Sequence, residues 1–192
     1  MYDPNFTINT CYGPINQDIL RKAKHIQLLI CDSDGVMSDG WIYQTNDGNI
    51  IQRFNVRDGY GIKCLLTCSI EVAIITGSQN QILKDRCSSL GISYIYQGQS
   101  NKIKPFNEIL TKLKLNEHQV AYIGDDLIDL PVLMKVGLSV AVSNSHPMLL
   151  PHVNYITKMT GGNGAIREVC DLILIAQNKI SRDFNGNLDG LC

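Results

Sequence analysis

The sequence lacks long hydrophobic runs and an excess of charge of either sign. Its 17 Lys and Arg residues nearly balance 18 Asp and Glu residues, which leaves a formal net charge of −1. Without a strong basic field, the chain is not expected to bind nucleic acid. The longest apolar stretches, such as residues 28–31, are far shorter than the roughly 20 residues that cross a bilayer, so no membrane partner is expected either.

Paired cysteine and histidine motifs are also missing. The seven cysteines include no C-x-x-C pair and the four histidines no H-x-x-x-H pair, so neither a zinc site nor a disulfide framework is indicated. The sequence contains no G-x-S-x-G elbow and no G-x-x-x-x-G-K-[ST] phosphate loop, which excludes two common hydrolase chemistries. Residues 1–10 carry no recognisable secretory signal, so we expect reduced thiols and a cytoplasmic location.

What is present is a composition that supports one packed domain. The chain has 192 residues, of which 44% are apolar and 18% charged, and these values are typical of a globular protein. We predict a single domain over residues 1–178. A flexible tail rich in Asn, Asp and Gly is predicted over residues 179–192.

From residue 26 onward, short runs of β-forming residues alternate with segments of helical spacing. This alternation predicts an α/β fold of Rossmann-like, three-layer architecture, with a mostly parallel sheet covered by helices on both faces. Strands are predicted at residues 26–32, 71–76, 94–97, 120–124, 139–142 and 154–156. Helices are predicted at residues 16–24, 61–68, 79–90, 104–114, 127–136 and 165–177. The Gly-Gly-Asn-Gly stretch at 161–164 is expected to be a loop.

Residues 40–54 interrupt the first crossover between strands. β-forming residues flank an Asn-Asp-Gly turn at residues 46–48, which predicts an inserted β-hairpin. On this hairpin Trp41 and Tyr43 would face one side and Ile42 the other, so neither face is wholly polar. Such a hairpin either packs on its own domain with some apolar surface exposed or forms a subunit interface.

Polar residues stand where four of the predicted strands end. Asp32 and Asp34 follow the first strand, Thr76 ends the second, Lys102 comes shortly after the third and Asp125 follows the fourth. Sites in parallel sheets form beyond the carboxyl ends of the strands, so these residues are expected to meet. Each aspartate taken alone could equally cap a helix or form a turn, but the ordered set argues against coincidence.

The aspartates of this set predict a metal site. Asp32 and Asp34 would project to the same side of an extended backbone. Carboxylates crowded in a partly dehydrated cleft repel one another, and a shared proton or a cation relieves the repulsion. With Asp125 and Asp126 arriving from another strand, an all-oxygen donor set forms that favours Mg²⁺ over Zn²⁺.

The ordered motifs resemble those of the haloacid dehalogenase-like phosphatases. The four ordered motifs cover residues 26–130. Further similar segments lie at 34–40, 54–61, 97–102 and 124–129, and the likeness runs over nearly the whole chain to about residue 176. It is strongest to members of the family that lack a cap domain and hydrolyse phosphate esters of sugar acids. It implies a Mg²⁺-dependent phosphatase that works through an aspartyl-phosphate intermediate.

The resemblance also implies the catalytic roles. Asp32 would attack phosphorus, while Asp34 would give a proton to the departing sugar oxygen and later take one from water. Thr76 and Lys102 would bind the phosphoryl group and balance its charge.

The same resemblance implies how the ion is held. Mg²⁺ would bind the carboxylate of Asp32, the main-chain carbonyl of Asp34 and the carboxylate of Asp125. Asp126 and Asp129 would support the site without binding the ion.

Substrate contacts are implied for a further set of residues. In the resembled enzymes the positions that line the sugar-acid pocket match Asp34, Asn55, Val56, Arg57, Asp58, Gly59, Lys63, Gly77, Ser78, Arg86 and Lys102. Arg57, Lys63 and Arg86 suit the carboxylate of a 2-keto acid, although Lys63 and Arg86 could equally be surface charges of helices. Ser33 and Ser78 depart from the family pattern, which commonly has an apolar residue and often an arginine at these two positions.

The motif spacings leave no room for a cap domain, so a single subunit would have an open active site. The resemblance implies a homotetramer in which hairpins assemble and neighbouring subunits cover the site. Two alternatives stay open: the same chemistry on another sugar-acid ester, such as a nonulosonate 9-phosphate, or a catalytically silent domain that binds a partner. The presence of both Asp32 and Asp34 disfavours the silent domain.

Overall fold

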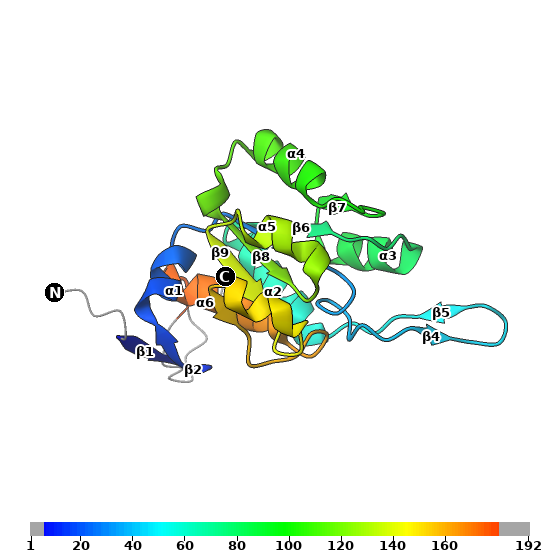
Figure 1. Ribbon diagram of the computed structural model, residues 1–192, viewed down its shortest axis with the longest axis horizontal. Helices are drawn as coiled ribbons and strands as arrows, with labels where there is room; N and C mark the ends of the chain where they lie inside the picture. Colours follow the sequence, from blue (N-terminus) through cyan, green and yellow to red (C-terminus); the bar gives the residue numbers. More distant parts are fainter. Residues whose placement is uncertain (1–5, 181–192) are drawn as a thin grey trace.

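A parallel sheet of six strands forms the centre of the molecule (Figure 1). The computed structural model describes residues 6–180. The strands follow the order β10-β9-β8-β3-β6-β7, and every neighbouring pair is parallel. They are β3 (Leu28–Cys31), β6 (Glu71–Ile75), β7 (Tyr94–Tyr96), β8 (Val120–Gly124), β9 (Leu138–Ala141) and β10 (Tyr155–Ile156). The predicted α/β fold is therefore confirmed, and β3 lies between β8 and β6.

Helices cover both faces of this sheet (Figure 1). One face carries α1 (Gln17–Ala23), α2 (Val56–Thr67), α3 (Gln81–Leu90) and α6 (Ala165–Ala176), and the other carries α4 (Ile103–Leu113) and α5 (Leu130–Leu133). Successive side chains of β3 enter opposite cores: Leu29 and Cys31 pack with the first set of helices, and Leu28 and Ile30 with the second. A strand buried on both faces explains the unbroken apolar run in the sequence.

All six predicted helices are present, four of them with ends within two residues of the prediction, and two have clearly different bounds. Helix α2 begins at Val56 rather than at residue 61, because the side chain of Asn55 accepts a 2.8 Å hydrogen bond from the Arg57 N–H and caps the helix. The predicted helix over 127–136 is a 3-10 turn (Leu127–Asp129) followed by the short α5. Pro131 has no N–H with which to continue an α-helix that starts at residue 127.

Several short elements were not predicted. Strands β1 (Thr7–Thr10) and β2 (Gly13–Asn16) form a separate antiparallel hairpin, and 3-10 turns lie at Glu117–Gln119 and Pro147–His152. The β2 sequence contains Gly, Pro and Asn, which are depleted in strands, so its composition gave no strand signal.

The predicted hairpin projects from the body of the molecule (Figure 1). Its paired residues are β4 (Tyr43–Gln44) and β5 (Ile50–Ile51), joined by a turn in which Gly48 has a φ of +86°. Trp41 is 73% exposed and Ile42 is 81% exposed. Within a single chain, the hairpin therefore has no cover on its own domain, and its apolar side chains stand in solvent.

The remaining predictions concern the chain end and the cysteines. Lys179 donates a 2.6 Å hydrogen bond to the carbonyl of Cys68, so the packed domain extends past residue 178, while residues 181–192 of the predicted tail lie outside the described residues. Cys11, Cys31, Cys64, Cys87 and Cys170 are free thiols, as predicted. The expectation of reduced thiols is wrong at Cys68, which is disulfide-bonded. None of the helices in residues 6–180 has the length and apolarity to span a membrane.

Candidate active site

Asp32 lies directly after the central strand β3 and is buried, with 6% of its surface exposed. Its backbone N–H continues the sheet by donating to the Ile123 carbonyl on β8 (3.0 Å). The side chain turns back to accept a 2.7 Å hydrogen bond from the Ser33 N–H through Oδ1. The sheet thus fixes both the position and the orientation of this carboxylate.

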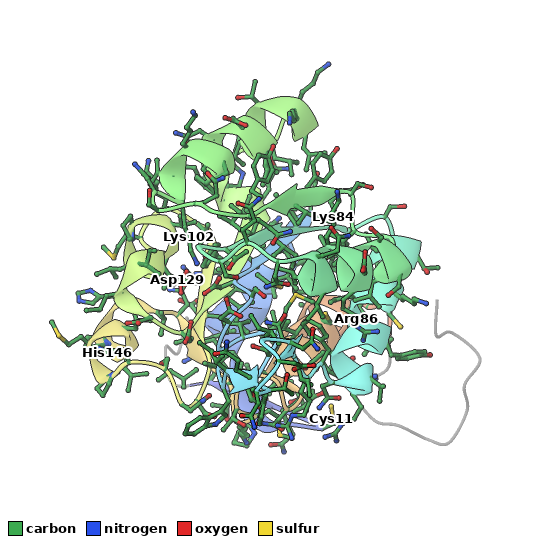
Figure 2. All side chains as sticks on the ribbon, turned by 90° about the vertical axis from the view of Figure 1, so that its right-hand side faces the viewer. Cys11, Lys84, Arg86, Lys102, Asp129 and His146 are labelled. Atoms are coloured by element: carbon green, nitrogen blue, oxygen red, sulfur yellow. The ribbon has the colours of Figure 1, made fainter. Side chains whose placement is uncertain are left out.

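Lys102 reaches the same carboxylate from the N-terminus of α4 and is 2% exposed. Its Nζ lies 2.9 Å from Asp32 Oδ1 and 2.7 Å from Asp129 Oδ1, and Figure 2 shows Lys102 and Asp129 next to each other on the side from which the hairpin projects. Burial lowers the pKa of the ammonium group, but the two carboxylates outweigh burial and the net pKa is raised. Lys102 therefore stays charged within the site.

Asp129 is fully buried and uses both of its oxygens in hydrogen bonds. Oδ1 accepts from Lys102 Nζ and from the Tyr122 hydroxyl (2.6 Å). Oδ2 accepts from the backbone N–H groups of Asp125 (3.0 Å) and Asp126 (3.2 Å). These bonds tie the loop after β8 to Lys102. Tyr122 is missing from the predicted site, and a hydroxyl in an otherwise apolar central strand was the only signal for it.

Three carboxylates converge where a cation would be expected. Oxygens of Asp32, Asp125 and Asp129 all lie within 4.8 Å of one another. Burial, followed by the charges of Asp32 and Asp129, raises the pKa of Asp125 to about 8, and burial with the charge of Asp129 raises the pKa of Asp32 to about 6. This mutual repulsion is what a divalent ion relieves, and the oxygen donors fit Mg²⁺.

The residues around this cluster also suit the predicted ligand set. Since Asp129 already accepts four hydrogen bonds, Asp32 and Asp125 are the carboxylates left to bind an ion. Gly35 has a φ of +85°, and a Cβ there would overlap the carboxylate of Asp125, so only glycine lets the turn after Asp34 approach this ligand. The carboxylate of Asp34 is not part of the cluster, and its main-chain carbonyl stays a predicted ligand.

Thr76 directly follows β6 and is 1% exposed. The hydroxyls of Thr76 and Ser78 share a 3.2 Å hydrogen bond. Backbone hydrogen bonds from Gln99 N–H to the Thr76 carbonyl and from Gly98 N–H to the Ser78 carbonyl (both 2.9 Å) join this loop to the segment that carries Lys102. These hydrogen bonds connect the segments that carry the two phosphate-binding candidates, Thr76 and Lys102.

Asp34 contacts a residue that sequence reasoning missed. Gln52, at the base of the hairpin, donates a hydrogen bond from Nε2 to Asp34 Oδ1 at 2.8 Å. Nothing in the spacing of the motifs indicated this contact, because it depends on how the hairpin folds back over the turn after β3.

Most of the predicted substrate residues fall into two groups, and Asp58 stands apart from both. Asn55, Gly59 and Arg86 lie together: Arg86 Nη2 donates to the Asn55 carbonyl (3.4 Å), and a Cβ at Gly59 would overlap that guanidinium. Val56, Arg57 and Lys63, on α2, and Gly77, after β6, are exposed. Asp58 is different, since its buried carboxylate accepts from the N–H groups of Gly164 and Arg167 and so caps α6.

The glycine-rich loop before α6 supports the catalytic turn. The Gly162 N–H donates to the Val36 carbonyl (2.8 Å), and a Cβ at Gly161 would overlap the carbonyl oxygen of Gly35. The departure at Ser33 lies against the same turn: its side chain is fully buried, and Oγ has no hydrogen-bond partner among the described residues. The predicted loop at 161–164 is confirmed, with a close packing role.

The comparisons with known proteins agree with this geometry. The sequence profile of the haloacid dehalogenase-like hydrolases matches residues 72–169. A parallel sheet that places a buried aspartate, a lysine and further carboxylates at its carboxyl edge is the site expected of that class, and the chain belongs to the haloacid dehalogenase-like hydrolases.

Several relatives within this class are phosphatases of the same name. The 3-deoxy-D-manno-octulosonate 8-phosphate phosphatase of Yersinia pestis is 58% identical over 90% of this chain and 92% of its own length, and that of Escherichia coli K12 is 57% identical over 91% and 93%. The crystal structure of the Yersinia pestis phosphatase has a TM-score of 0.90 and covers 91% of this chain and 94% of that one. The Moraxella catarrhalis phosphatase, solved with magnesium, phosphate and KDO, is 43% identical, covers 85% and 94%, and has a TM-score of 0.83.

Proposed function

We propose that this protein hydrolyses 3-deoxy-D-manno-octulosonate 8-phosphate to 3-deoxy-D-manno-octulosonate and inorganic phosphate, in the synthesis of lipopolysaccharide precursors, with Mg²⁺ as cofactor. The observation that carries the proposal is 57–58% identity to phosphatases of this name over about nine-tenths of the chain. The buried assembly of Asp32, Lys102 and Asp129 supports a working catalyst rather than a silent binding domain.

The reaction has two displacements at phosphorus. A carboxylate oxygen of Asp32 attacks, the bond from phosphorus to the sugar oxygen breaks, and that oxygen takes a proton from Asp34. Water then attacks the aspartyl-phosphate, gives its proton to Asp34 and releases phosphate with Asp32 restored. The hydrogen bonds from Ser33 and Lys102 to Asp32 Oδ1 hold the nucleophile in one orientation before the substrate arrives.

The ion is held in this proposal by the carboxylates of Asp32 and Asp125 and by the main-chain carbonyl of Asp34. When bound, Mg²⁺ offsets the repulsion between the anionic nucleophile and the anionic ester. Lys102 adds a fixed positive charge for the transferring group, and Thr76 supplies a hydroxyl to one phosphoryl oxygen.

Recognition of the sugar acid is assigned to the surface around the start of α2. Arg86, held over Asn55 and 6.0 Å from the centre of the Phe54 ring, is the candidate for the carboxylate of the substrate, and exposed Arg57 and Lys63 add positive charge nearby. Val56, Gly77 and Ser78 complete the proposed lining. Asp58 contributes indirectly, because its carboxylate is used at the start of α6.

We further propose that the protein assembles as a homotetramer in which hairpins of neighbouring subunits meet and cover the active site. The support is the exposed apolar surface of Trp41, Ile42, Ile50 and Ile51, since contiguous apolar surface of this kind marks interfaces. Five of the described cysteines are free thiols and one, Cys68, is disulfide-bonded. The predominance of free thiols favours a reducing compartment, and we place the reaction in the cytoplasm.

The proposal is tested by phosphate release from 3-deoxy-D-manno-octulosonate 8-phosphate, compared with a nonulosonate 9-phosphate and unrelated sugar phosphates. We expect turnover with Mg²⁺, none with EDTA, and the highest kcat/KM for the octulosonate ester. Asp32→Asn should remove turnover. Preference for the nonulosonate ester would replace the substrate assignment, and absence of Mg²⁺-dependent turnover on every ester would favour the silent binding domain.

A further inference from the structure

Gln52 is the one hairpin side chain that reaches the catalytic turn. It follows β5 and is half-buried, with Nε2 2.8 Å from Asp34 Oδ1. Its Oε1 is buried and has no hydrogen-bond partner among residues 6–180. A buried amide oxygen without a donor is costly, so the site gains free energy when a donor reaches this oxygen.

The base of the hairpin is anchored so that Gln52 is held in place. The next residue, Arg53, forms a 3.1 Å ion pair with Asp39 and donates a 3.2 Å hydrogen bond to Asn163. Asp39 lies just before the hairpin and Asn163 on the glycine-rich loop before α6, so Arg53 ties the returning arm of the hairpin to both segments. Two residues further on, Asn55 caps α2.

The orientation of the Gln52 amide follows from the charge of its partner. An ionised carboxylate only accepts hydrogen bonds, so the NH₂ group must face Asp34 Oδ1. The opposite orientation would place two acceptors face to face. This hydrogen bond occupies Oδ1, and Oδ2 is the Asp34 oxygen that Gln52 leaves free.

We propose that Gln52 is a positioning residue for Asp34 and a specificity contact for the substrate. Its Nε2 holds Oδ1 so that Oδ2 gives the proton to the departing sugar oxygen, and its Oε1 accepts a hydrogen bond from a hydroxyl of the sugar close to the ester. This inference rests on the proposed function only in taking Asp34 as the proton donor. It gives the hairpin a role within its own subunit, separate from assembly.

Three substitutions separate the two halves of the amide. Gln52→Leu removes donor and acceptor, and should lower kcat for the sugar ester at least about tenfold, a fraction of the contribution of general acid catalysis, and raise KM. Gln52→Lys keeps a donor and should restore most of kcat while KM stays raised. Gln52→Glu loses the donor and places a second carboxylate beside Asp34, so kcat should fall at least as far as in Gln52→Leu. Gln44→Leu, on the same hairpin and exposed, is the matched control and should change neither.

The leaving group distinguishes positioning from damage to the fold. A p-nitrophenolate departs without a proton, so Gln52→Leu should slow p-nitrophenyl phosphate hydrolysis by less than about threefold. Equal losses on the alkyl and aryl esters, or no loss on either, would overturn the proposal. The ratio can be measured with any alkyl phosphate that the unmodified protein turns over. Failure of the unmodified protein on the octulosonate ester therefore counts against the proposed function, and the ratio alone judges Gln52.

Discussion

At the scale of single residues, Asp129 organises the site, although in our proposal it is neither the nucleophile nor a ligand of the ion. Its two oxygens connect the lysine that neutralises Asp32 with the backbone that carries Asp125. The family resemblance implied a supporting role for Asp129. It could not predict Tyr122 or Gln52, because their contacts arise from strand pairing and from the path of the hairpin rather than from local sequence.

Asp129→Asn should destabilise the protein as well as slow it. Every position around the carboxylate is a donor, so an amide NH₂ would face another donor, and breaking a buried ion pair costs about 3–5 kcal/mol. We expect the melting temperature to fall by roughly 6–20 °C, together with a loss of phosphatase activity. Asp126→Asn, which alters the exposed carboxylate three residues earlier, is the control. A melting temperature equal to that of the control would contradict this account of Asp129.

Stabilisation by Mg²⁺ should grow with pH. The pKa values of Asp32 and Asp125 are raised to about 6 and about 8, so the metal-free fold retains protons that the unfolded chain releases. The associated stability is present at low pH and is lost as pH rises through these values. Because Mg²⁺ binds the ionised carboxylates, the stability that it adds increases over the same pH range.

Melting curves with Mg²⁺ and with EDTA at pH 5.5 and 8.5 check this directly. The Mg²⁺-induced rise in melting temperature should be larger at the higher pH. Asp125→Asn should remove most of that pH dependence, since it deletes the group with the higher pKa. A rise in melting temperature that is equal at both pH values would show that the carboxylates are not coupled to the ion as described.

At the scale of elements, the strands were the most predictable part of the fold. The apolar runs of the four central strands are buried on both faces, so the pattern survived in the sequence, and β8 has the predicted bounds. Helix starts were less predictable where a capping side chain or a proline decided them, as at Asn55 and Pro131. The β1–β2 hairpin was not predicted, since its strands are largely half-exposed and β2 is poor in β-forming residues.

Asp58 links two of these elements, and its substitution should affect stability more than binding. Its carboxylate caps α6 from within α2, through the N–H groups of Gly164 and Arg167. Asp58→Ala should lower the free energy of unfolding by about 2 kcal/mol, because two buried donors lose their acceptor. Asp58→Asn keeps one acceptor and should cost less.

Urea unfolding of both Asp58 variants measures this difference, and KM for the sugar ester provides the second readout. Little change in KM beside a clear loss of stability is the expected pattern. A large rise in KM with unchanged stability would instead return Asp58 to the substrate pocket.

At the scale of the whole molecule, the projecting hairpin is the feature on which the proposed assembly rests. The sequence predicted the absence of a cap domain and the two-sided apolar pattern of the hairpin. The number of subunits depends on contacts between chains and does not follow from the sequence of one chain. Ile42 is 81% exposed and lies outside the contacts that hold Gln52, so it can be altered without disturbing the catalytic turn.

Ile42→Asp should dissociate the assembly by placing a charge in an apolar interface. Native mass spectrometry should show a shift from tetramer towards smaller species, with the helical circular dichroism signal unchanged. Asn46→Asp, at the polar tip of the hairpin, is the control for added charge. An unmodified protein that is monomeric at micromolar concentration would refute the assembly itself.

The position of β3 in the sheet also determines when the site can exist during synthesis. Its neighbours β6 and β8 both come later in the chain, and β8 ends at Gly124, 92 residues after Asp32 (124 − 32). At the usual rate of translation this separation corresponds to about 5–20 s. The nascent chain therefore carries its nucleophile for that time without a metal partner, and reactivity toward phosphate esters begins only after most of the chain has left the ribosome.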